Sequence, residues 1–279
     1  MSDPVRFSAL KWMARSPAHY RYYAQYGIEE TLAMRLGSGC HAILFEQPFV
    51  VWDATNEKTG KKRNRSGAAW EEFEAEHAGK VILNVREHGE ASRMADAIRS
   101  HNDARWLLFG EDVTHEQRVH WASLGRDRSC TPDARATQHI AELKTTRCAE
   151  PDRFCRDGLF RHYPAQLADQ MDGVVASGLG RPSEAYIVAV ESTPPHCITV
   201  MRLTEQALMQ GRKSCRVWLE RLIGCERDDY WPGYVESIVP FDVEAELELT
   251  FGADSDDESG PVVSASALKA SVEEMDAAF

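Results

Sequence analysis

The sequence predicts an α/β fold, with a mixed, mostly antiparallel central β-sheet flanked by helices and an additional helical region at the N-terminus. Apolar residues recur at helical spacing over much of the segment from Ser8 to Phe109. Short alternating segments, which are typical of strands, follow between His115 and Lys144. Two further strand-like segments, Ala185–Glu191 and Cys197–Leu203, lie between helical ones. Helices and strands that alternate in this way pack as layers around a common core.

The N-terminal region is expected to hold three helices. Residues Ser8–Tyr26 predict one helix, a stop at Ser16-Pro17 and a second short helix, because the residue before a proline disfavours helical backbone. A third helix is expected over Thr31–Glu46. It carries His41 and a stripe of small residues that allows another backbone or DNA to come close, namely Gly37, Ser38 and Gly39.

A polar, basic loop is expected over Val51–Gly67, followed by helices over Ala68–Gly79 and Ala91–Phe109. The cations of this loop either form a solvated surface or contact DNA phosphates, and the sequence leaves both interpretations open. The candidates for phosphate contact are Lys61, Lys62, Arg63 and Arg65.

The rest of the chain is predicted to alternate between strands and helices. Strands are expected at His115–Trp121, Arg128–Ala136, His139–Lys144, Ala185–Glu191, Cys197–Leu203 and Glu236–Val239. Helices are expected at Leu159–Ala176 and from Thr204, a residue type favoured at N-caps, through Cys225. Turns are expected at Pro194-Pro195 and at Trp231-Pro232-Gly233-Tyr234.

The composition is ordinary for a globular protein, with 43% hydrophobic and 27% charged residues. We expect one large domain over residues 1–251, followed by a flexible acidic linker and a short helix over residues 252–279. The net charge of −12 argues against coating DNA by bulk attraction. Half of that excess lies in the tail, however, so a locally basic groove in the body stays compatible with a nucleic-acid substrate.

The cysteines and the N-terminus indicate a reducing compartment. There are seven cysteines, an odd number, and no Cys-x-x-Cys pair, which disfavours both a disulfide framework and a zinc ribbon. The sequence contains no run of about 18 apolar residues, so no membrane span is predicted. The first residues lack the basic and apolar parts of a signal peptide, so a cytoplasmic location is expected.

The most informative string is Thr131-Pro132-Asp133, followed after eight residues by Glu142-Leu143-Lys144. Side chains alternate along a strand, so Glu142 and Lys144 share one face, and Asp133 on the neighbouring strand can reach the same point. Two carboxylates that meet there repel each other unless a cation lies between them, which suits Mg²⁺ or Mn²⁺. The competing interpretation is a surface salt bridge between Glu142 and Lys144, with Asp133 in a turn.

These strings resemble the PD-(D/E)xK nucleases, and among them the RecE-type and phage lambda-type 5′→3′ exonucleases. The resemblance implies a restriction-endonuclease-like core and covers nearly the whole body of the chain. It rests on Ser16-Pro17-Ala18-His19-Tyr20, Leu36–Phe49, Cys130–Ala134, Ala141–Thr146, Tyr163-Pro164-Ala165-Gln166 and Trp231–Tyr234.

The resemblance also implies a role for each matched position. His41, Asp133, Glu142 and the carbonyl group of Leu143 are implied as metal ligands. Lys144 is implied as the catalytic lysine.

Other matched positions are implied to contact the substrate. Gln166 is expected to brace the lysine and the DNA. Ser8 and Thr131 are implied as hydrogen-bond donors to a terminal 5′-phosphate, and ordinary capping or turn roles for these two hydroxyls remain open.

Three positions depart from the pattern of the relatives. Many of these have Asp where this chain has Glu142, an accepted variant, and Arg where it has Thr131. Many also have Tyr four residues after the glutamine, where this chain has Gln170. The last difference concerns one contact between helix and substrate and not the chemistry.

The function implied by the resemblance is that of a Mg²⁺-dependent exodeoxyribonuclease, in which Mn²⁺ substitutes for Mg²⁺. It would digest one strand of linear double-stranded DNA from 5′ to 3′ and leave 3′ single strands for homologous recombination. The expected partners are DNA ends, a single-strand annealing protein of the RecT or beta type, and further copies of the chain in a trimeric or tetrameric ring. A bacterial or phage-infected cell is the implied setting.

Three alternatives remain. One is a Cas4-like or helicase-fused nuclease, which requires four cysteines for an iron–sulfur cluster, and the spacing of the cysteines here disfavours it. Another is a catalytically silent DNA-binding or interaction module on the same fold. The third is an endonuclease of the restriction type, for which no target-recognition segment is evident.

The C-terminal tail carries one more expectation. Leu268, Val272, Met275 and Phe279 fall on one face of a helix, which could dock on the annealing protein or on the ring itself. A terminus without function is the alternative.

Overall fold

The computed structural model describes residues 3–56 and 59–240. The chain divides into a compact unit that ends at Tyr234 and a second unit that begins at Val235. Residues 235–240 of the second unit contain no helix or strand, so the predicted strand Glu236–Val239 is wrong. The predicted domain boundary after residue 251, the acidic linker and the terminal helix lie outside the described residues.

The main sheet has five strands in the order β10-β9-β8-β7-β4. The strands β8 and β9 run parallel, and the other three neighbouring pairs run antiparallel. The expectation of a mixed, mostly antiparallel sheet is therefore confirmed. The strands span Thr114–His115 (β4), Ala134–Arg135 (β7), His139–Thr146 (β8), Glu184–Glu191 (β9) and Ile198–Arg202 (β10).

Two smaller sheets accompany it. The first has the order β1-β6-β5, formed by Val5–Arg6, Arg126–Cys130 and Val119–Ser123. The second pairs β2 (Phe49–Trp52) in parallel with β3 (Val81–Asn84), and neither strand was expected from the sequence.

The helices begin where capping residues place them. Ser16, Thr31 and Thr204 each accept a hydrogen bond from the backbone N–H three residues later, which satisfies one otherwise unpaired donor at a helix start. The N-cap role expected for Thr204 is thus confirmed. The helices span Phe7–Leu10 (α1), Lys11–Ala14 (η1, a 3₁₀ turn), Pro17–Tyr26 (α2), Leu32–Leu44 (α3), Ala68–Glu76 (α4), Val85–Ser100 (α5), Asn102–Phe109 (α6), Pro151–Phe160 (α7), Tyr163–Ala176 (α8) and Glu205–Asp228 (α9).

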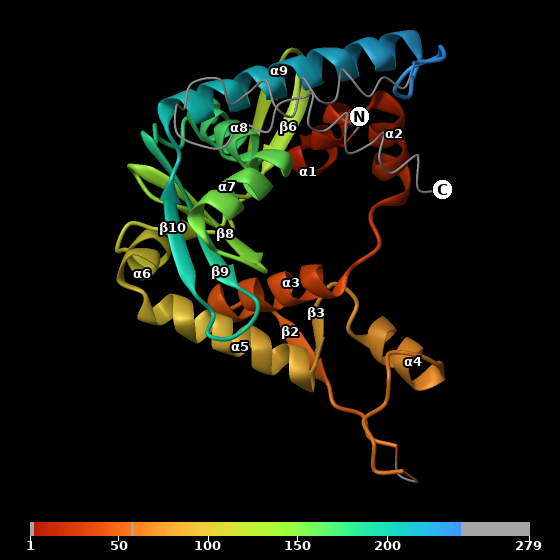
Figure 1. Cartoon of the computed structure of the whole chain (residues 1–279), viewed down its shortest axis with the longest axis vertical. Helices are drawn as coiled ribbons and strands as arrows, with labels where there is room; N and C mark the ends of the chain where they lie inside the picture. The colour runs from red at the N-terminus through yellow and green to blue at the C-terminus, as the bar shows by residue number, and fades with distance from the viewer. Residues whose placement is uncertain (1–2, 57–58, 241–279) are drawn as a thin grey trace, which may run out of the picture. The chain divides into compact units, whose positions relative to one another are not determined.

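Helices cover both faces of the main sheet, with α3 and α5 on one side and α7 and α8 on the other (Figure 1). The alternation of β8 matches this arrangement. Ala141 and Leu143 belong to the core shared with α3, α5 and α6, whereas Ile140 belongs to the core shared with α7 and α8. Glu142 and Lys144 have the same parity as Ile140, so their side chains start on the α8 side.

A third core joins the N-terminal helices to α9. Leu10 and Met13 are completely buried there against residues of α9 such as Leu219 and Leu222. The helix α9 also lies unusually close to the start of α8, because a Cβ atom on Gly211 would be 2.5 Å from the carbonyl oxygen of Pro164. This packing places α1 and η1 beside the first turns of α8.

Four predicted elements are interrupted in the structure. The helix expected over Ala91–Phe109 starts earlier, at Val85, and breaks at His101. The helix expected over Leu159–Ala176 is two helices separated at Arg161-His162. The two strands expected at His115–Trp121 and Arg128–Ala136 each divide between the main sheet and the three-stranded sheet, with the breaks at residues 116–118 and 131–133. Among the described residues, no helix combines the length and hydropathy needed to cross a membrane.

Candidate functional site

Glu142 on β8 accepts hydrogen bonds at both carboxylate oxygens. Its Oε2 atom lies 2.7 Å from Nζ of Lys144 and 2.8 Å from Nε2 of Gln166 on α8. The alternation of the strand therefore brings Glu142 and Lys144 together as the sequence predicted. Since Glu142 is only 2% exposed, these charge-assisted bonds are little weakened by solvent.

Gln170, one helical turn after Gln166, holds the other oxygen of the same carboxylate. Its Nε2 atom lies 2.6 Å from Oε1 of Glu142, and its own Oε1 is buried without a hydrogen-bond partner. From the sequence, Gln170 is recognisable only as a departure from the relatives, at a position expected to contact the substrate. Its four-residue spacing from Gln166 on one helix was the signal that could have placed both amides on the same face.

Asp133 is positioned by the backbone of β8. The backbone N–H of Leu143 donates to Oδ2 of Asp133 at 2.7 Å, and the N–H of Asp133 points to Oε1 of Glu142 at 3.4 Å. Asp133 is buried, in the short link Thr131–Asp133 between β6 and β7. The structure thus joins the two halves of the predicted motif.

His41 reaches this point from α3. Its Nε2 atom lies 3.4 Å from the carbonyl oxygen of Leu143 and 3.7 Å from Oδ2 of Asp133. Its Nδ1 atom lies 3.7 Å from Oε1 of Glu116. Nitrogen or oxygen atoms of His41, Glu116 and Asp133 all lie within 4.8 Å of one another, which is close enough to hold a metal ion.

Glu116 was not singled out from the sequence. It occupies the break between β4 and β5 with a positive φ of 52°, a left-handed backbone conformation that is uncommon for residues other than glycine. The strand predicted over His115–Trp121 includes Glu116 as an ordinary strand residue, so the prediction gives no sign of the break there. What marks Glu116 is its backbone conformation, which depends on tertiary contacts and cannot be identified from the sequence alone.

Buried charged groups at this site shift one another's pKa values. Burial and the neighbouring Glu142 raise the pKa of Asp133 to about 7. Burial lowers the pKa of His41, but the carboxylates of Asp133 and Glu116 outweigh it and raise that pKa to about 9. Burial also lowers the pKa of Lys144, and the charges of Glu142 and Asp133 outweigh it so that the pKa stays above its usual value. A site with this many buried carboxylates favours the binding of a cation.

The donor set fits a divalent cation that prefers oxygen. A carboxylate, a backbone carbonyl and an imidazole converge at Asp133, Leu143 and His41. Mg²⁺ and Mn²⁺ accept such ligands. Of the four expected ligands, Glu142 differs from the others because its oxygens already contact Lys144, Gln166 and Gln170.

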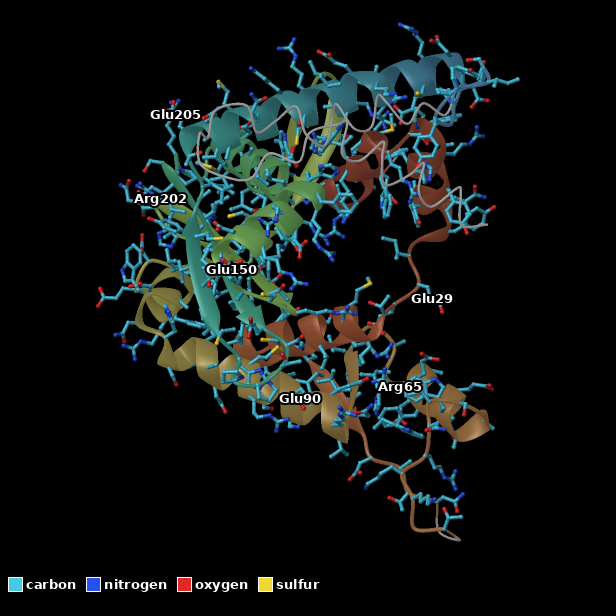
Figure 2. The ribbon with its side chains drawn as sticks, in the orientation of Figure 1. Glu29, Arg65, Glu90, Glu150, Arg202 and Glu205 are labelled. Atoms are coloured by element: carbon cyan, nitrogen blue, oxygen red, sulfur yellow. The ribbon has the colours of Figure 1, made fainter. Side chains whose placement is uncertain are left out.

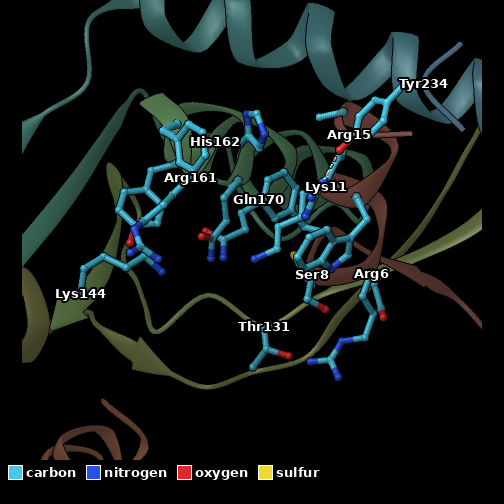
Figure 3. A pocket seen from close by; sticks show the side chains of 18 residues that line it. Arg6, Ser8, Lys11, Arg15, Thr131, Lys144, Arg161, His162, Gln170 and Tyr234 are labelled. Atoms are coloured by element: carbon cyan, nitrogen blue, oxygen red, sulfur yellow. Dashed lines mark hydrogen bonds between the residues drawn. The ribbon is translucent and has the colours of Figure 1, made fainter. Parts of the chain in front are cut away.

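A cavity of about 1000 Å³ opens beside Lys144, between α1, η1, β6 and α8. Figure 3 shows side chains such as Lys11, Lys144 and Gln170 directed into it. The cavity lining holds no aspartate or glutamate among the described residues, although the chain as a whole carries a net charge of −12. Its cations are Arg6, Lys11, Arg15, Lys144 and Arg161.

The crowded cations of this cavity repel one another. Burial, together with the charges of Lys144 and Arg161, holds the pKa of Lys11 below its usual value. An anion in the cavity would relieve that repulsion. Ser8 and Thr131, the two predicted phosphate donors, both line the same cavity, as does Gln166.

The four basic loop residues lie elsewhere. Arg65 donates to the carbonyl oxygen of Ile82 and to Glu87, and it lies beside α4 in Figure 2. Lys62 pairs with Asp53, while Lys61 and Arg63 are exposed. None of the four is among the residues that line the cavity, so the structure does not bring this loop to the site.

The model of a family described as a PDDEXK-like domain of unknown function (DUF3799) matches residues 6–241. A search of the curated proteins finds no match. A solved structure described as a candidate exonuclease from Eubacterium rectale has a TM-score of 0.61 and 12% identity, and the alignment covers 89% of this chain and 93% of that one.

A second solved structure, an alkaline exonuclease from Laribacter hongkongensis, has 15% identity and a TM-score of 0.28. The alignment covers 69% of this chain and 91% of that one. The first of the two structures has the same overall fold as this chain, and the second is too dissimilar to support an argument.

Proposed function

This chain belongs to the PDDEXK-like domain family, and on that premise we propose that it is a metal-dependent nuclease that degrades DNA from its ends. The resemblance found in the sequence to the PD-(D/E)xK proteins is confirmed by the match over residues 6–241. The observation that carries the proposal is the position of Lys144. Its Nζ lies 2.7 Å from Glu142 beside the predicted metal ligands, and the same side chain lines the cationic cavity.

The residues around Lys144 would divide the chemistry among them. His41, Asp133 and the Leu143 carbonyl, with Glu142 beside them, would hold Mg²⁺, for which Mn²⁺ would substitute. When bound, such an ion acidifies water and polarises a phosphoryl oxygen. Lys144 would hold the attacking water and stabilise the negative charge that develops on the phosphate. Gln166 and Gln170 would hold the Glu142 carboxylate in place while Lys144 acts on the water and the phosphate.

The cavity would bind the end of a DNA strand. Arg6, Lys11 and Arg161 would attract the terminal phosphate, and the hydroxyl groups of Ser8 and Thr131 would donate hydrogen bonds to it. Aromatic side chains in the lining, such as Trp12 and Tyr163, offer faces on which bases stack. A phosphate recognised at the strand terminus would place the first internucleotide bond near Lys144. That this terminus is the 5′ end rests on the resemblance to RecE-type and lambda-type enzymes.

The wider assignment rests on the resemblance to RecE-type and lambda-type enzymes. It comprises digestion of one strand to leave 3′ single-stranded DNA, assembly into a trimeric or tetrameric ring, and cooperation with a single-strand annealing protein in recombination. A ring would let an acidic protein stay on DNA by enclosing it, so that a strong electrostatic attraction is not needed.

The test is a cleavage assay on linear duplex DNA labelled at either the 5′ or the 3′ end. We expect early release of the 5′ label with Mg²⁺ and no release with EDTA. Early release of the 3′ label would overturn the polarity. Cleavage of closed circular DNA would indicate an endonuclease, and binding without any cleavage would indicate a silent DNA-binding module.

A further inference from the structure

We infer that four aromatic side chains beside the cavity form a surface on which the bases of single-stranded DNA stack. This surface, called the aromatic row below, consists of Trp12, Tyr23, Tyr22 and Tyr26. The inference rests on the nuclease function proposed above and adds to it the form of the substrate, which is a DNA end whose terminal nucleotides are unpaired.

The aromatic row starts in the cavity and leads out of it along α2. Trp12 lines the cavity together with Lys144, and its ring stacks on that of Tyr23, with centroids 3.8 Å apart and 24° between the planes. The ring of Tyr22 lies edge-on to Tyr23 at 5.3 Å, and the ring of Tyr26 lies 5.0 Å from that of Tyr22. A strand whose end lies in the cavity therefore has a continuous series of rings beside it.

The outer half of the aromatic row is exposed, whereas another face of α2 is packed. Tyr20 packs against the core that joins the N-terminal helices to α9, and its ring stacks on Trp231 at 6.0 Å. Tyr22 and Tyr26, which lie one turn apart on the same helix, are 57% and 67% exposed. Large exposed rings that adjoin one another are typical of an interaction site.

The charge around the aromatic row suits a polyanion. Residues 4–28, which include the whole row, contain no aspartate or glutamate, although the chain has a net charge of −12. The cations of this segment are Arg6, Lys11, Arg15 and Arg21. Tyr22 and Tyr26 also line a hollow of about 290 Å³, whose described lining residues likewise include no aspartate or glutamate.

Arg21 is placed to contact phosphates along the row. It lines the same hollow as Tyr22 and Tyr26. Its one printed ion pair, with Asp229 at 3.6 Å, joins side chains that are 55% and 82% exposed. An exposed pair of this kind contributes little free energy, so a phosphate can displace the carboxylate at little cost.

Single-stranded DNA fits these features better than a protein surface does. Proteins that hold single strands without sequence preference combine cations along the phosphates with aromatic rings on which successive bases stack. In a duplex the faces of the bases are covered by their neighbours, so the rings can reach them only after the strand is unpaired. A protein partner would account for the exposed tyrosines, but it would not require a segment free of acidic residues that continues into the cationic cavity.

The experiment measures DNA binding in EDTA, so that metal-dependent cleavage does not interfere. The ligand is a fluorescently labelled thymidine oligonucleotide of about 12 nucleotides, and binding is followed by anisotropy. The full chain is compared with Tyr22→Ala, Tyr26→Ala and Tyr22→Phe. Trp106→Ala is the control, because it removes a 59% exposed ring from α6, which lies away from α2 in Figure 1.

Two further measurements complete the design. A duplex that ends in unpaired nucleotides is compared with a blunt duplex in the same assay, which tests the preference for unpaired ends. Light scattering gives the number of copies in each variant, which tests whether α2 instead joins copies of the chain.

We expect Tyr22→Ala and Tyr26→Ala each to weaken binding of the oligonucleotide about 5- to 100-fold, the range for one base–aromatic contact. Tyr22→Phe keeps the ring and should bind as the unchanged protein does, as should Trp106→Ala. The unchanged protein should prefer the unpaired end to the blunt end, and both alanine variants should lose part of that preference.

The aromatic row would be refuted by unchanged binding in both alanine variants, or by an equal loss in Tyr22→Phe or Trp106→Ala. Failure of the unchanged protein to bind the oligonucleotide or to prefer unpaired ends would also refute it. A changed number of copies in the alanine variants would make α2 a contact between copies instead. The nuclease function is decided separately, by Mg²⁺-dependent cleavage in the unchanged protein: binding through the row without cleavage would refute only the nuclease function.

Discussion

Gln170 Nε2 lies 2.6 Å from Oε1 of Glu142, although 28 positions separate the two residues in the chain. With Gln166 and Lys144 on Oε2, this bond leaves the Glu142 carboxylate fixed from two elements, the strand β8 and the helix α8. The position of the carboxylate therefore depends on how α8 packs on the sheet. Nη2 of Arg128 donates to both carboxylate oxygens of Asp169, at 2.8 and 2.9 Å, and this buried pair anchors the helix α8 against the strand β6.

Lys144→Ala should reduce DNA cleavage by about 10²–10³-fold or more, because it removes the positive charge that would stabilise the transition state. Folding and metal binding should persist, since the predicted metal ligands remain. The measurement is a single-turnover assay on end-labelled duplex, with metal titration in parallel. Lys213→Ala on the exposed side of α9 is the control. Near-normal cleavage by Lys144→Ala would refute the assignment of this site.

Gln170→Leu should lower cleavage about 10- to 100-fold while changing the free energy of unfolding little. The substitution removes the donor to Glu142, but it also removes a buried Oε1 that has no partner, and these two effects on stability oppose each other. Val175→Ala, at an exposed position of the same helix, should leave both quantities unchanged. Unaltered kinetics in Gln170→Leu would mean that Gln166 and Lys144 suffice to hold the carboxylate.

Metal affinity should rise with pH. The pKa of Asp133 is raised to about 7 and that of His41 to about 9, so both groups retain protons that a cation must displace. Mg²⁺ binding should therefore strengthen as the pH passes through about 7 and continue to strengthen towards about 9. Calorimetry in buffers of different ionisation enthalpy gives the number of protons released. An affinity that does not change over this range would contradict the argument.

Ser8→Ala and Thr131→Val should each reduce the preference for 5′-phosphorylated over 5′-hydroxyl ends. Loss of one hydrogen bond to a charged phosphate costs about 1.5–3 kcal/mol, which corresponds to roughly tenfold or more in binding. Lys11→Ala should instead weaken binding to both kinds of end. It should also reduce, by about 1, the slope of the logarithm of the binding constant against the logarithm of the salt concentration. Equal effects of the Ser8 and Thr131 variants on both ends would show that these hydroxyls do not recognise the phosphate.

Gly211→Ala should destabilise the fold by about 1–3 kcal/mol, because the added Cβ would lie 2.5 Å from the carbonyl oxygen of Pro164. Gly224→Ala on the same helix meets no atom within 4 Å and should stabilise by roughly 0.5–1 kcal/mol. Urea unfolding measures both variants under the same conditions. Equal free energies of unfolding for the two variants would contradict the close approach of α9 to α8.

The small-residue stripe on α3 packs against neighbours that the sequence does not reveal. The sequence predicts that Gly37 and Gly39 leave room for another backbone or for DNA. In the structure a Cβ on Gly39 would meet Leu83 of β3 at 2.9 Å, and one on Gly37 would meet Thr145 of β8 at 3.1 Å. The close neighbours are therefore side chains of the same chain, on β3, on β8 and, for Gly39, also on α5, where Ala91 would lie 3.2 Å away. Of these elements, β3 was not predicted at all, because a four-residue strand carries too little pattern to recognise.

The sequence by itself determined the features that depend on near neighbours in the chain. The alternation of β8 placed Glu142 and Lys144 on one face, and the hydroxyl groups of Ser16, Thr31 and Thr204 set the starts of three helices. Only the tertiary structure decided which distant residues complete the site. Glu116 and Gln170 reach it through a left-handed backbone position and through the packing of α8, and both depend on contacts between segments far apart in sequence. Local pattern reports backbone periodicity, whereas a site is assembled from several elements whose relative placement is decided by the packing of the core.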